Sequence, residues 1–225
     1  MKYKFLIIAL VAFFANVLNA QNLIVNGDFE NPVNGFGFNV NGNGYNLITP
    51  PYAVATSAGD YTFTTDPHLF NASSFITGGD HTSGAGKMMV IDGNGNGGAQ
   101  RFWRAGTNGA GICGLTIGKT YTFSYWIKSV ATTVIDNATR ANIGFQFTNA
   151  TNVVPSTTAD LAPLPIDGWQ KVTYAFKPTN TCVYIELWNN NTSFVGNDFA
   201  VDDFSLVLTL PTATINGSTS VCKNG

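Results

Sequence analysis

The segment Gly196-Asn-Asp-Phe-Ala-Val-Asp-Asp-Phe-Ser-Leu206 decides the fold that we predict for this chain. Apolar and polar residues alternate along it, as they do in the segment from Asn22 to Glu30 near the other end. A period of two is typical of a β-strand that buries one face. We therefore expect these segments to be the closing and the opening strand of one β-domain.

Further runs of the same kind lie between these two segments. They are separated by clusters of Asn and Gly, such as Asp92 to Gly98, which supply the positive φ angles of tight turns. No stretch after residue 20 has a convincing helical period. The sequence therefore predicts an all-β fold, an antiparallel β-sandwich of the jelly-roll type, over residues 21–210. The predicted strands are Leu23 to Phe29, Lys87 to Asp92, Gln100 to Arg104, Thr120 to Lys128, Ala141 to Thr148, Gln170 to Lys177, Cys182 to Trp188 and Phe199 to Leu208.

Residues 1–20 have the composition of a secretory signal peptide. Lys2 and Lys4 precede an apolar run from Phe5 to Val17, and Ala20 supplies the small residue that signal peptidases require. The alternative, a membrane anchor, needs roughly 20 apolar residues, and this run is shorter. We expect cleavage after Ala20 and a protein that is secreted or displayed on the cell surface, without membrane insertion.

The charge of the chain excludes some partners. Charged residues make up only 11% of the sequence, and acidic residues outnumber basic ones by 13 to 11. No basic patch for nucleic acid follows from this balance. An acidic protein also repels anionic polymers such as acidic polysaccharides, so any polymeric ligand is expected to be neutral.

An exported chain can form disulfides, and this one has Cys113, Cys182 and Cys222. Cys113 and Cys182 are candidates to pair across the sandwich, which leaves one cysteine over. Residues 211–225, which contain Cys222, resemble the opening strand of the immunoglobulin-like repeats of Bacteroidetes-type surface proteins. The resemblance implies further domains after residue 225, and the alternative is a disordered tail.

Strand parity gives the candidate ligand site, because successive side chains point to opposite faces. In Thr120 to Lys128 the odd-numbered positions are the apolar set, which leaves Trp126 on the other face. If this strand shares a sheet with 141–148 and 182–188, their polar faces form one aromatic platform edged with amides. Its members are Trp126, Tyr184, Glu186, Trp188, Gln146 and Asn142.

Such a platform suits a sugar, since pyranose C–H groups stack on aromatic faces and hydroxyls bond to amides and carboxylates. The alternative is that long loops cover Trp126 and Trp188. A second aromatic group either lines a loop-edge site or packs a long connection onto the sheet. It consists of Tyr45, Tyr52, Tyr61, Phe63, Phe70 and Trp103.

Motifs in a fixed order give the chain a family resemblance. They are Asn26-Gly-Asp-Phe-Glu30, Asp80-His-Thr-Ser-Gly84, Gly118-Lys-Thr-Tyr121, Gly168-Trp169 and Asp202-Asp203. In this order they resemble the jelly-roll carbohydrate-binding modules and their galactose-binding-like relatives. The resemblance implies a structural calcium ion where the first and last strands meet, held by Glu30 and Asp202, with Asp28 and Asp203 as further candidates. The alternative is that Asp202 and Asp203 cap a β-bulge or accept backbone N–H groups.

Catalytic motifs are not apparent in the sequence. A glycosidase uses two carboxylates that flank the scissile bond, and no partner for Glu186 can be identified. We therefore predict a non-catalytic carbohydrate-binding module that targets a larger exported protein to polysaccharide or surface glycan. The alternative is a structural or adhesive unit of a cell-surface protein, and joint exposure of Trp126, Tyr184 and Trp188 distinguishes the two.

Overall fold

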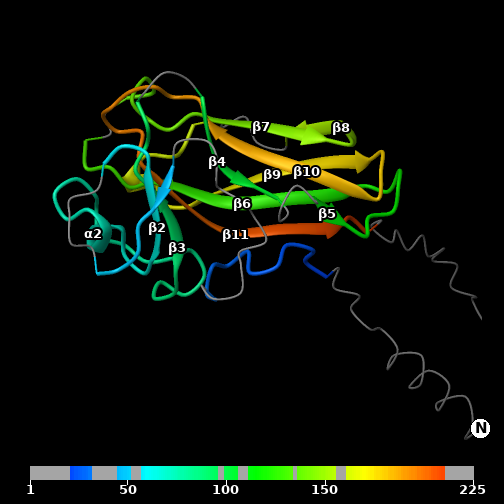
Figure 1. Ribbon diagram of the computed structural model, residues 1–225, viewed down its shortest axis with the longest axis horizontal. Helices are drawn as coiled ribbons and strands as arrows, with labels where there is room; N and C mark the ends of the chain where they lie inside the picture. Colours follow the sequence, from blue (N-terminus) through cyan, green and yellow to red (C-terminus); the bar gives the residue numbers. More distant parts are fainter. Residues whose placement is uncertain are drawn as a thin grey trace, which may run out of the picture.

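The computed structural model describes residues 21–31, 45–51, 57–95, 99–105, 111–133, 136–155 and 161–210. Over these ranges the chain forms two β-sheets that pack face to face (Figure 1). The expected signal peptide and the immunoglobulin-like segment 211–225 lie outside the described residues. No helix within the described ranges is both long enough and apolar enough to cross a bilayer.

The larger sheet has the strand order β1-β2-β3-β11-β6-β9-β8 in the described part of the chain. Its neighbours run antiparallel, except that β1 pairs with β2 in parallel. Strand β11 lies at the centre, between β3 and β6. The strands are β1 Asn46–Leu47, β2 Asp60–Thr64, β3 Met88–Ile91, β6 Tyr121–Ser129, β8 Ala150–Pro155, β9 Gln170–Pro178 and β11 Phe199–Leu208.

The smaller sheet is built around β10, which pairs antiparallel with β4, β5 and β7. The chain then crosses between the sheets from β7 to β8 at Asn149, whose φ of 65° breaks the extended backbone. A short helix, α2, packs beside β2 and β3. The remaining bounds are β4 Gln100–Arg104, β5 Ile112–Cys113, β7 Ile143–Thr148, β10 Cys182–Asn189, α2 Pro67–Phe70 and the 3₁₀-helix η1 Pro165–Asp167.

The predicted all-β sandwich is confirmed, and so are the strands predicted from residue 87 onwards, with small shifts at their ends. Strands β1, β2, β5 and β8 were not predicted, because they are short or lack a clear alternation. The predicted opening strand from Leu23 to Phe29 is wrong. Asn26 and Phe29 have positive φ angles of 54° and 57°, so the segment turns instead of extending, and it is held to β11 by bonds such as Leu23 N–H to Leu206 O.

The predicted parity of β6 and β10 is correct. The core between the sheets takes Phe123 and Tyr125 from β6 and Ile185 and Leu187 from β10, all of them buried. Much of the second aromatic group also packs inside, which confirms the packing interpretation for its buried members. Those members are Tyr45, Tyr61, Phe70 and Trp103, while Phe63 packs partly buried against the core and Tyr52 lies outside the described residues.

A β-bulge interrupts β11 between Asp202 and Ser205, where its register with β6 shifts. Asp203 has a φ of 51°, which is the left-handed conformation. The extra residue reverses the alternation. As a result Val201 and Phe204 both face the core, although they are three residues apart.

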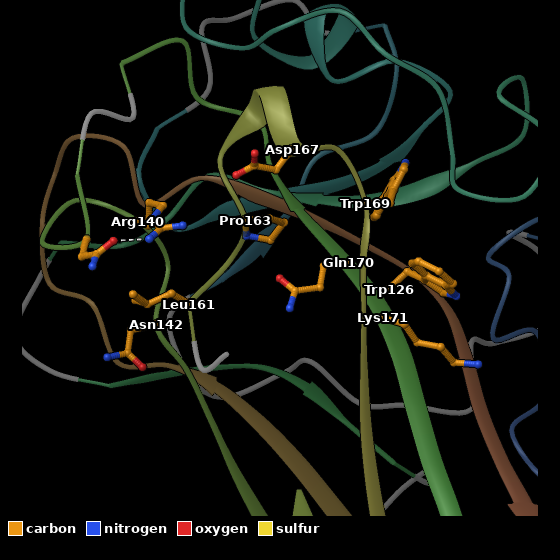
Figure 2. A pocket seen from close by; sticks show the side chains of 10 residues that line it. Trp126, Arg140, Asn142, Leu161, Pro163, Asp167, Trp169, Gln170 and Lys171 are labelled. Carbon is orange, nitrogen blue, oxygen red and sulfur yellow. Dashed lines mark hydrogen bonds between the residues drawn. The ribbon is translucent and has the colours of Figure 1, made fainter. Parts of the chain in front are cut away.

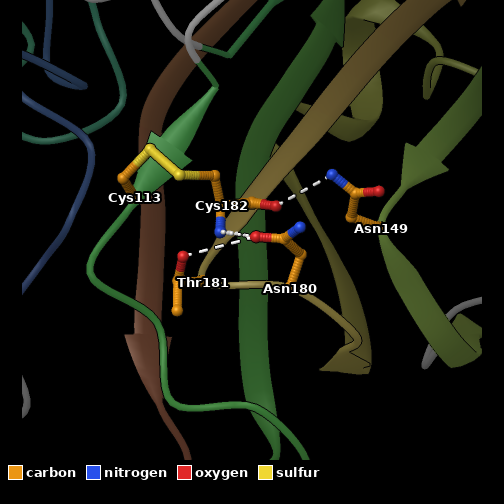
Figure 3. Close-up of a disulfide and its surroundings, with 5 residues drawn as sticks. All are labelled: Cys113, Asn149, Asn180, Thr181 and Cys182. Carbon is orange, nitrogen blue, oxygen red and sulfur yellow. Dashed lines mark hydrogen bonds between the residues drawn. A yellow bond between two sulfur atoms is a disulfide. The ribbon is translucent and has the colours of Figure 1, made fainter.

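The predicted disulfide partners Cys113 and Cys182 are bonded. The predicted route across the sandwich is wrong, because the two residues lie opposite each other on β5 and β10 of one sheet. Figure 3 shows the bond and the side chains around Cys182. Asn180 accepts a hydrogen bond from Cys182 N–H, and Asn149 donates one to Cys182 O.

Replacing both Cys113 and Cys182 by serine is expected to lower the free energy of unfolding by about 4 kcal/mol, because the bond closes a loop of 69 residues in the unfolded chain. Urea denaturation measures this loss. Cys222→Ser is the control and should leave the stability unchanged. Equal destabilisation by Cys222→Ser would contradict the assigned pairing.

Candidate functional site

The aromatic platform expected from parity is not one surface. Trp126 belongs to β6 in the larger sheet, whereas Tyr184 and Trp188 belong to β10 in the smaller one. All three point away from the core, so they lie on opposite outer faces of the sandwich. The condition that these strands share a sheet is wrong, and the joint platform is wrong with it.

The outer face of the smaller sheet does bring four of the predicted residues together. Alternate positions of β10 are occupied by Tyr184, Glu186 and Trp188, and Gln146 of β7 lies directly opposite Glu186. Their strands pair in register, so these side chains share one face. The aromatic rings of this face are partly covered, because arginine side chains of β4 lie beside them.

Arg101 and Arg104 of β4 cover this face. Arg101 Nη1 forms an ion pair with Glu186 Oε1, and Arg104 Nε lies 3.6 Å from the same oxygen. The guanidinium of Arg101 lies 5.7 Å from the centre of the Trp188 ring, and that of Arg104 lies 5.9 Å from the centre of the Tyr184 ring. The sequence did not indicate either arginine, since their pairing with β10 is not visible in a local pattern.

The remaining predicted residues, Trp126 and Asn142, line an open cavity of about 930 Å³, here called the Trp126 groove. Figure 2 shows two indoles at one side, Arg140, Asn142 and Leu161 at the other, and Gln170 and Pro163 between them. The groove has aromatic surface facing planar polar groups. Its described lining consists of Trp126, Asn137, Arg140, Asn142, Leu161, Pro163, Asp167, Trp169, Gln170 and Lys171.

Neighbouring strands place the two indoles. Trp126 pairs in register with Lys171 of β9, and Trp169 directly precedes that strand. Lys128 Nζ lies 4.6 Å from the centre of the Trp169 ring. The sequence indicated Trp169 only as the start of a strand, because the β6–β9 pairing decides that it joins Trp126.

The opposite wall of the groove is held by hydrogen bonds to backbone and side-chain oxygens. Arg140 Nη1 donates to Ala162 O at 3.1 Å, and Arg140 Nη2 donates to Asn137 Oδ1. Asn191 Nδ2 in turn donates to Ala138 O at 2.9 Å. The two Arg140 bonds hold this cation and the Asn137 amide of the lining in place before any ligand arrives, which reduces the entropic cost of binding.

His81 joins the groove to a second hollow. Its ring stacks on Trp126 with centroids 3.7 Å apart. Its Nδ1 lies 2.6 Å from Asp203 Oδ2, and its backbone N–H donates to Asp202 Oδ2 at 2.9 Å. Asp202 therefore accepts backbone N–H bonds at the β-bulge, whereas Asp203 is contacted by the side chains of His81 and Thr82.

The second hollow, here called the acidic pocket, measures about 390 Å³. Three of the four predicted calcium ligands line it, namely Asp28, Glu30 and Asp203. The fourth, Asp202, is 1% exposed. Asp80 is a further carboxylate of this pocket that the sequence did not indicate. The full lining in the described residues is Asp28, Glu30, Asp80, Thr82, Ser83, Ala85, Gly86 and Asp203.

Hydrogen bonds and burial shift the pKa values of two aspartates in this region, Asp80 and Asp202. Burial alone would raise the pKa of Asp80, but bonds from the Ser83 and Gly86 N–H groups and the Ser83 hydroxyl outweigh it and lower the pKa. Burial raises the pKa of Asp202 to about 8, and the charge of Asp203 adds to the rise. Negative charge is therefore easier to hold at Asp80 than at Asp202.

Gly86 lets two carboxylates converge in the acidic pocket. A Cβ at Gly86 would lie 1.9 Å from Glu30 Oε1 and 3.1 Å from Asp80 Oδ2. Carboxylate oxygens of this kind are the donors that calcium prefers, so the donor chemistry fits the predicted ion. Over the ranges that the structure describes, no group of three or more His, Cys, Asp or Glu side chains is placed so that it could hold a metal ion, so calcium binding stays a prediction.

Comparisons with known proteins assign no family. No protein-family model matches the chain, and no curated protein matches it. Among solved structures, the chain is similar to a cyclase from Fischerella sp. TAU, crystallised in complex with 4-(1H-indol-3-yl)butan-2-one. The two share 13% sequence identity with a TM-score of 0.48, and the match covers 85% of this chain and 98% of the cyclase.

Gly86→Ala is expected to destabilise the protein by about 1–3 kcal/mol, because its methyl group would displace the Glu30 carboxylate. Thermal unfolding of the purified chain measures the loss. In a Glu30→Ala background the same substitution should cost less, since the nearest obstructing atom is gone. Equal costs in the two backgrounds would show that Glu30 does not occupy this position.

Proposed function

We propose that this chain is a non-catalytic carbohydrate-binding domain of an exported protein, and that the sugar lies in the Trp126 groove. The observation that carries the proposal is the composition of the groove wall. Two indoles, Trp126 and Trp169, face Asn142 and Arg140 across an open cavity of about 930 Å³, and Gln170 lies between the two walls.

This combination suits a pyranose ring. Its C–H faces stack on indoles, and its hydroxyl groups need donors and acceptors in fixed positions. His81 stacks on the Trp126 indole and so supports the ring from outside the groove. An aromatic ring that is already immobilised loses little conformational entropy on binding.

The charges of the groove support binding rather than glycoside hydrolysis. Asp167 is the single carboxylate among the described lining residues, while a glycosidase commonly uses two. Arg140 and Lys171 also line the groove, so its described lining carries more positive than negative charge. A neutral glycan remains our choice of ligand, because the whole chain is acidic.

The wider role follows from the sequence. A leader of signal-peptide type precedes the sandwich, and an immunoglobulin-like segment follows it. We propose that the domain is secreted or displayed on the cell surface, where it holds a larger protein against polysaccharide. It is similar in motif order to the jelly-roll carbohydrate-binding modules, and this assignment is part of the proposal.

We also propose a structural calcium ion in the acidic pocket. Glu30 and Asp80 converge on Gly86, and Asp203 lines the same pocket. Calcium would supply positive charge that lets these carboxylates lie close together. The loop from Asp80 to Gly86 carries His81, so an ion there would also stabilise the support of Trp126.

A second candidate function is a structural or adhesive unit that binds no sugar. The division of Trp126 from Tyr184 and Trp188 favours it, because joint exposure of these rings was the expected mark of a binding platform. The rings on the smaller sheet are also close to Arg101 and Arg104. A retention assay separates the two functions.

Trp126→Ala and Trp169→Ala are each expected to weaken retention on a neutral polysaccharide by about fivefold or more, since an aromatic stack contributes about 1 kcal/mol. Affinity electrophoresis against a panel of polysaccharides measures the change. Trp188→Ala is the matched control, because it removes an indole from the opposite face. Circular dichroism checks that each variant is folded.

Loss of retention with Trp188→Ala but not with Trp126→Ala would contradict the groove and favour the smaller sheet. Failure of the folded wild-type chain to bind any glycan of the panel would favour the structural unit. Asn142→Ala tests the opposite wall of the groove, away from the His81 stack.

Calcium at about 100 times its dissociation constant is expected to stabilise the wild-type chain by about 2.7 kcal/mol relative to chelator. Differential scanning calorimetry measures the difference. Glu30→Gln should reduce the calcium effect, because it removes a negatively charged donor. An undiminished calcium effect in Glu30→Gln would argue against an ion in the acidic pocket.

A further inference from the structure

Two carboxylates face each other at one end of the larger sheet, and neither site described above uses them. Ile91 pairs with Phe199 between the antiparallel strands β3 and β11. The next positions outward are Asp92 and Asp198, here called the carboxyl pair, and their side chains are within hydrogen-bonding range of each other. Like charges opposite each other on neighbouring strands destabilise a sheet.

An amide oxygen without a partner points to the same place. Asn197 is 1% exposed, and its Oδ1 makes no hydrogen bond. This oxygen would lie 1.8 Å from a Cβ at Gly93, the residue that follows Asp92. Asn197 Nδ2 donates to Asn191 O at 3.3 Å, which holds the oxygen in this direction. A buried carbonyl oxygen without a donor costs about 1–3 kcal/mol.

Gly93 is the point on which these oxygens converge. Its N–H donates to Asp198 Oδ1 at 2.8 Å, while Asn197 Oδ1 approaches from its Cα side. The other influences on the Asp198 carboxyl are burial and Asp92, and no Lys, Arg or His of the described residues is among them. Negative charge at Asp198 is therefore not neutralised by a basic side chain in this part of the chain.

Further oxygen-bearing side chains surround the carboxyl pair. The Tyr45 hydroxyl lies 3.5 Å from Asn94 N, and it also contacts the Asn189 side chain. Burial raises the pKa of Tyr45 to about 12, so the hydroxyl stays neutral. A neutral hydroxyl and amides can orient carboxylates around an ion without adding a competing positive charge.

We propose that the carboxyl pair and Asn197 Oδ1 bind a hard divalent cation of the calcium class. Two carboxylates and an amide carbonyl are the oxygen donors that such ions take, and water completes their coordination. The cation would offset the repulsion within the pair and give Asn197 Oδ1 its missing partner. This site is separate from the acidic pocket and independent of glycan binding.

A shared proton is the competing account of the carboxyl pair. Burial and the charge of Asp92 raise the pKa of Asp198 to about 7, so one proton would relieve the repulsion in acid. It would not give Asn197 Oδ1 a partner, since that oxygen lies at Gly93 and accepts no bond. The two accounts differ in their response to calcium and to a third carboxylate.

Calorimetric titration of the chelator-treated chain with calcium chloride at pH 8 tests the proposal. Asp198→Asn is expected to weaken one calcium-binding event by about tenfold or more, because it removes a charged ligand. Asn197→Asp should tighten the same event severalfold, because it places a carboxylate where the unpartnered oxygen is. Glu30→Gln and Asp60→Asn are the controls and should keep the event.

Each result of the titration either supports or overturns the proposed cation site. Loss in Asp198→Asn with retention in both controls supports the site. An unchanged titration in folded Asp198→Asn overturns it, as does a wild-type chain that takes up no calcium. If Asp198→Asn does not fold, Asn197→Asp decides: stronger calcium binding supports the cation, and weaker or unchanged binding leaves only the shared proton. No glycan enters the experiment, so its result is independent of the Trp126 groove.

Discussion

The β-bulge at Asp202 and Asp203 allows β11 to bury both of its halves. Val201 faces the core before the bulge and Phe204 faces it afterwards, although a regular strand would turn one of them to the surface. Phe204 stacks on Trp103 of the smaller sheet at 4.4 Å and on Tyr125 of β6 at 5.3 Å. The packing of the two sheets against each other therefore depends on this one extra residue.

The same bulge organises the surface outside the larger sheet. It turns Asp202 and Asp203 toward the segment around His81, which bonds to both of them. His81 in turn stacks on Trp126, a wall of the groove. Core packing, the acidic pocket and the groove are thus connected through contacts of a few ångströms.

Sandwich architecture separates the candidate surfaces. Each sheet has one buried and one outer face, so residues that point outward from β6 and from β10 cannot meet. The outer face of the smaller sheet carries Glu186, and two arginines lie over the aromatic rings of that face. The larger sheet leaves room beside Trp126. The carboxyl pair occupies a third position, at an end of the larger sheet where β3 and β11 meet.

The sequence by itself determined the all-β class, most strand positions and which side chains face inward, because alternation along a strand is a local property. It also indicated Trp126, Asn142 and the carboxylates Glu30, Asp202 and Asp203 as residues of interest. Only the tertiary structure decided which strands share a sheet. That assignment depends on long-range pairing, such as that of β6 with β9 and β11. The pairing separated Trp126 from Trp188 and placed Trp126 beside Trp169 and His81. It also placed Asp92 opposite Asp198.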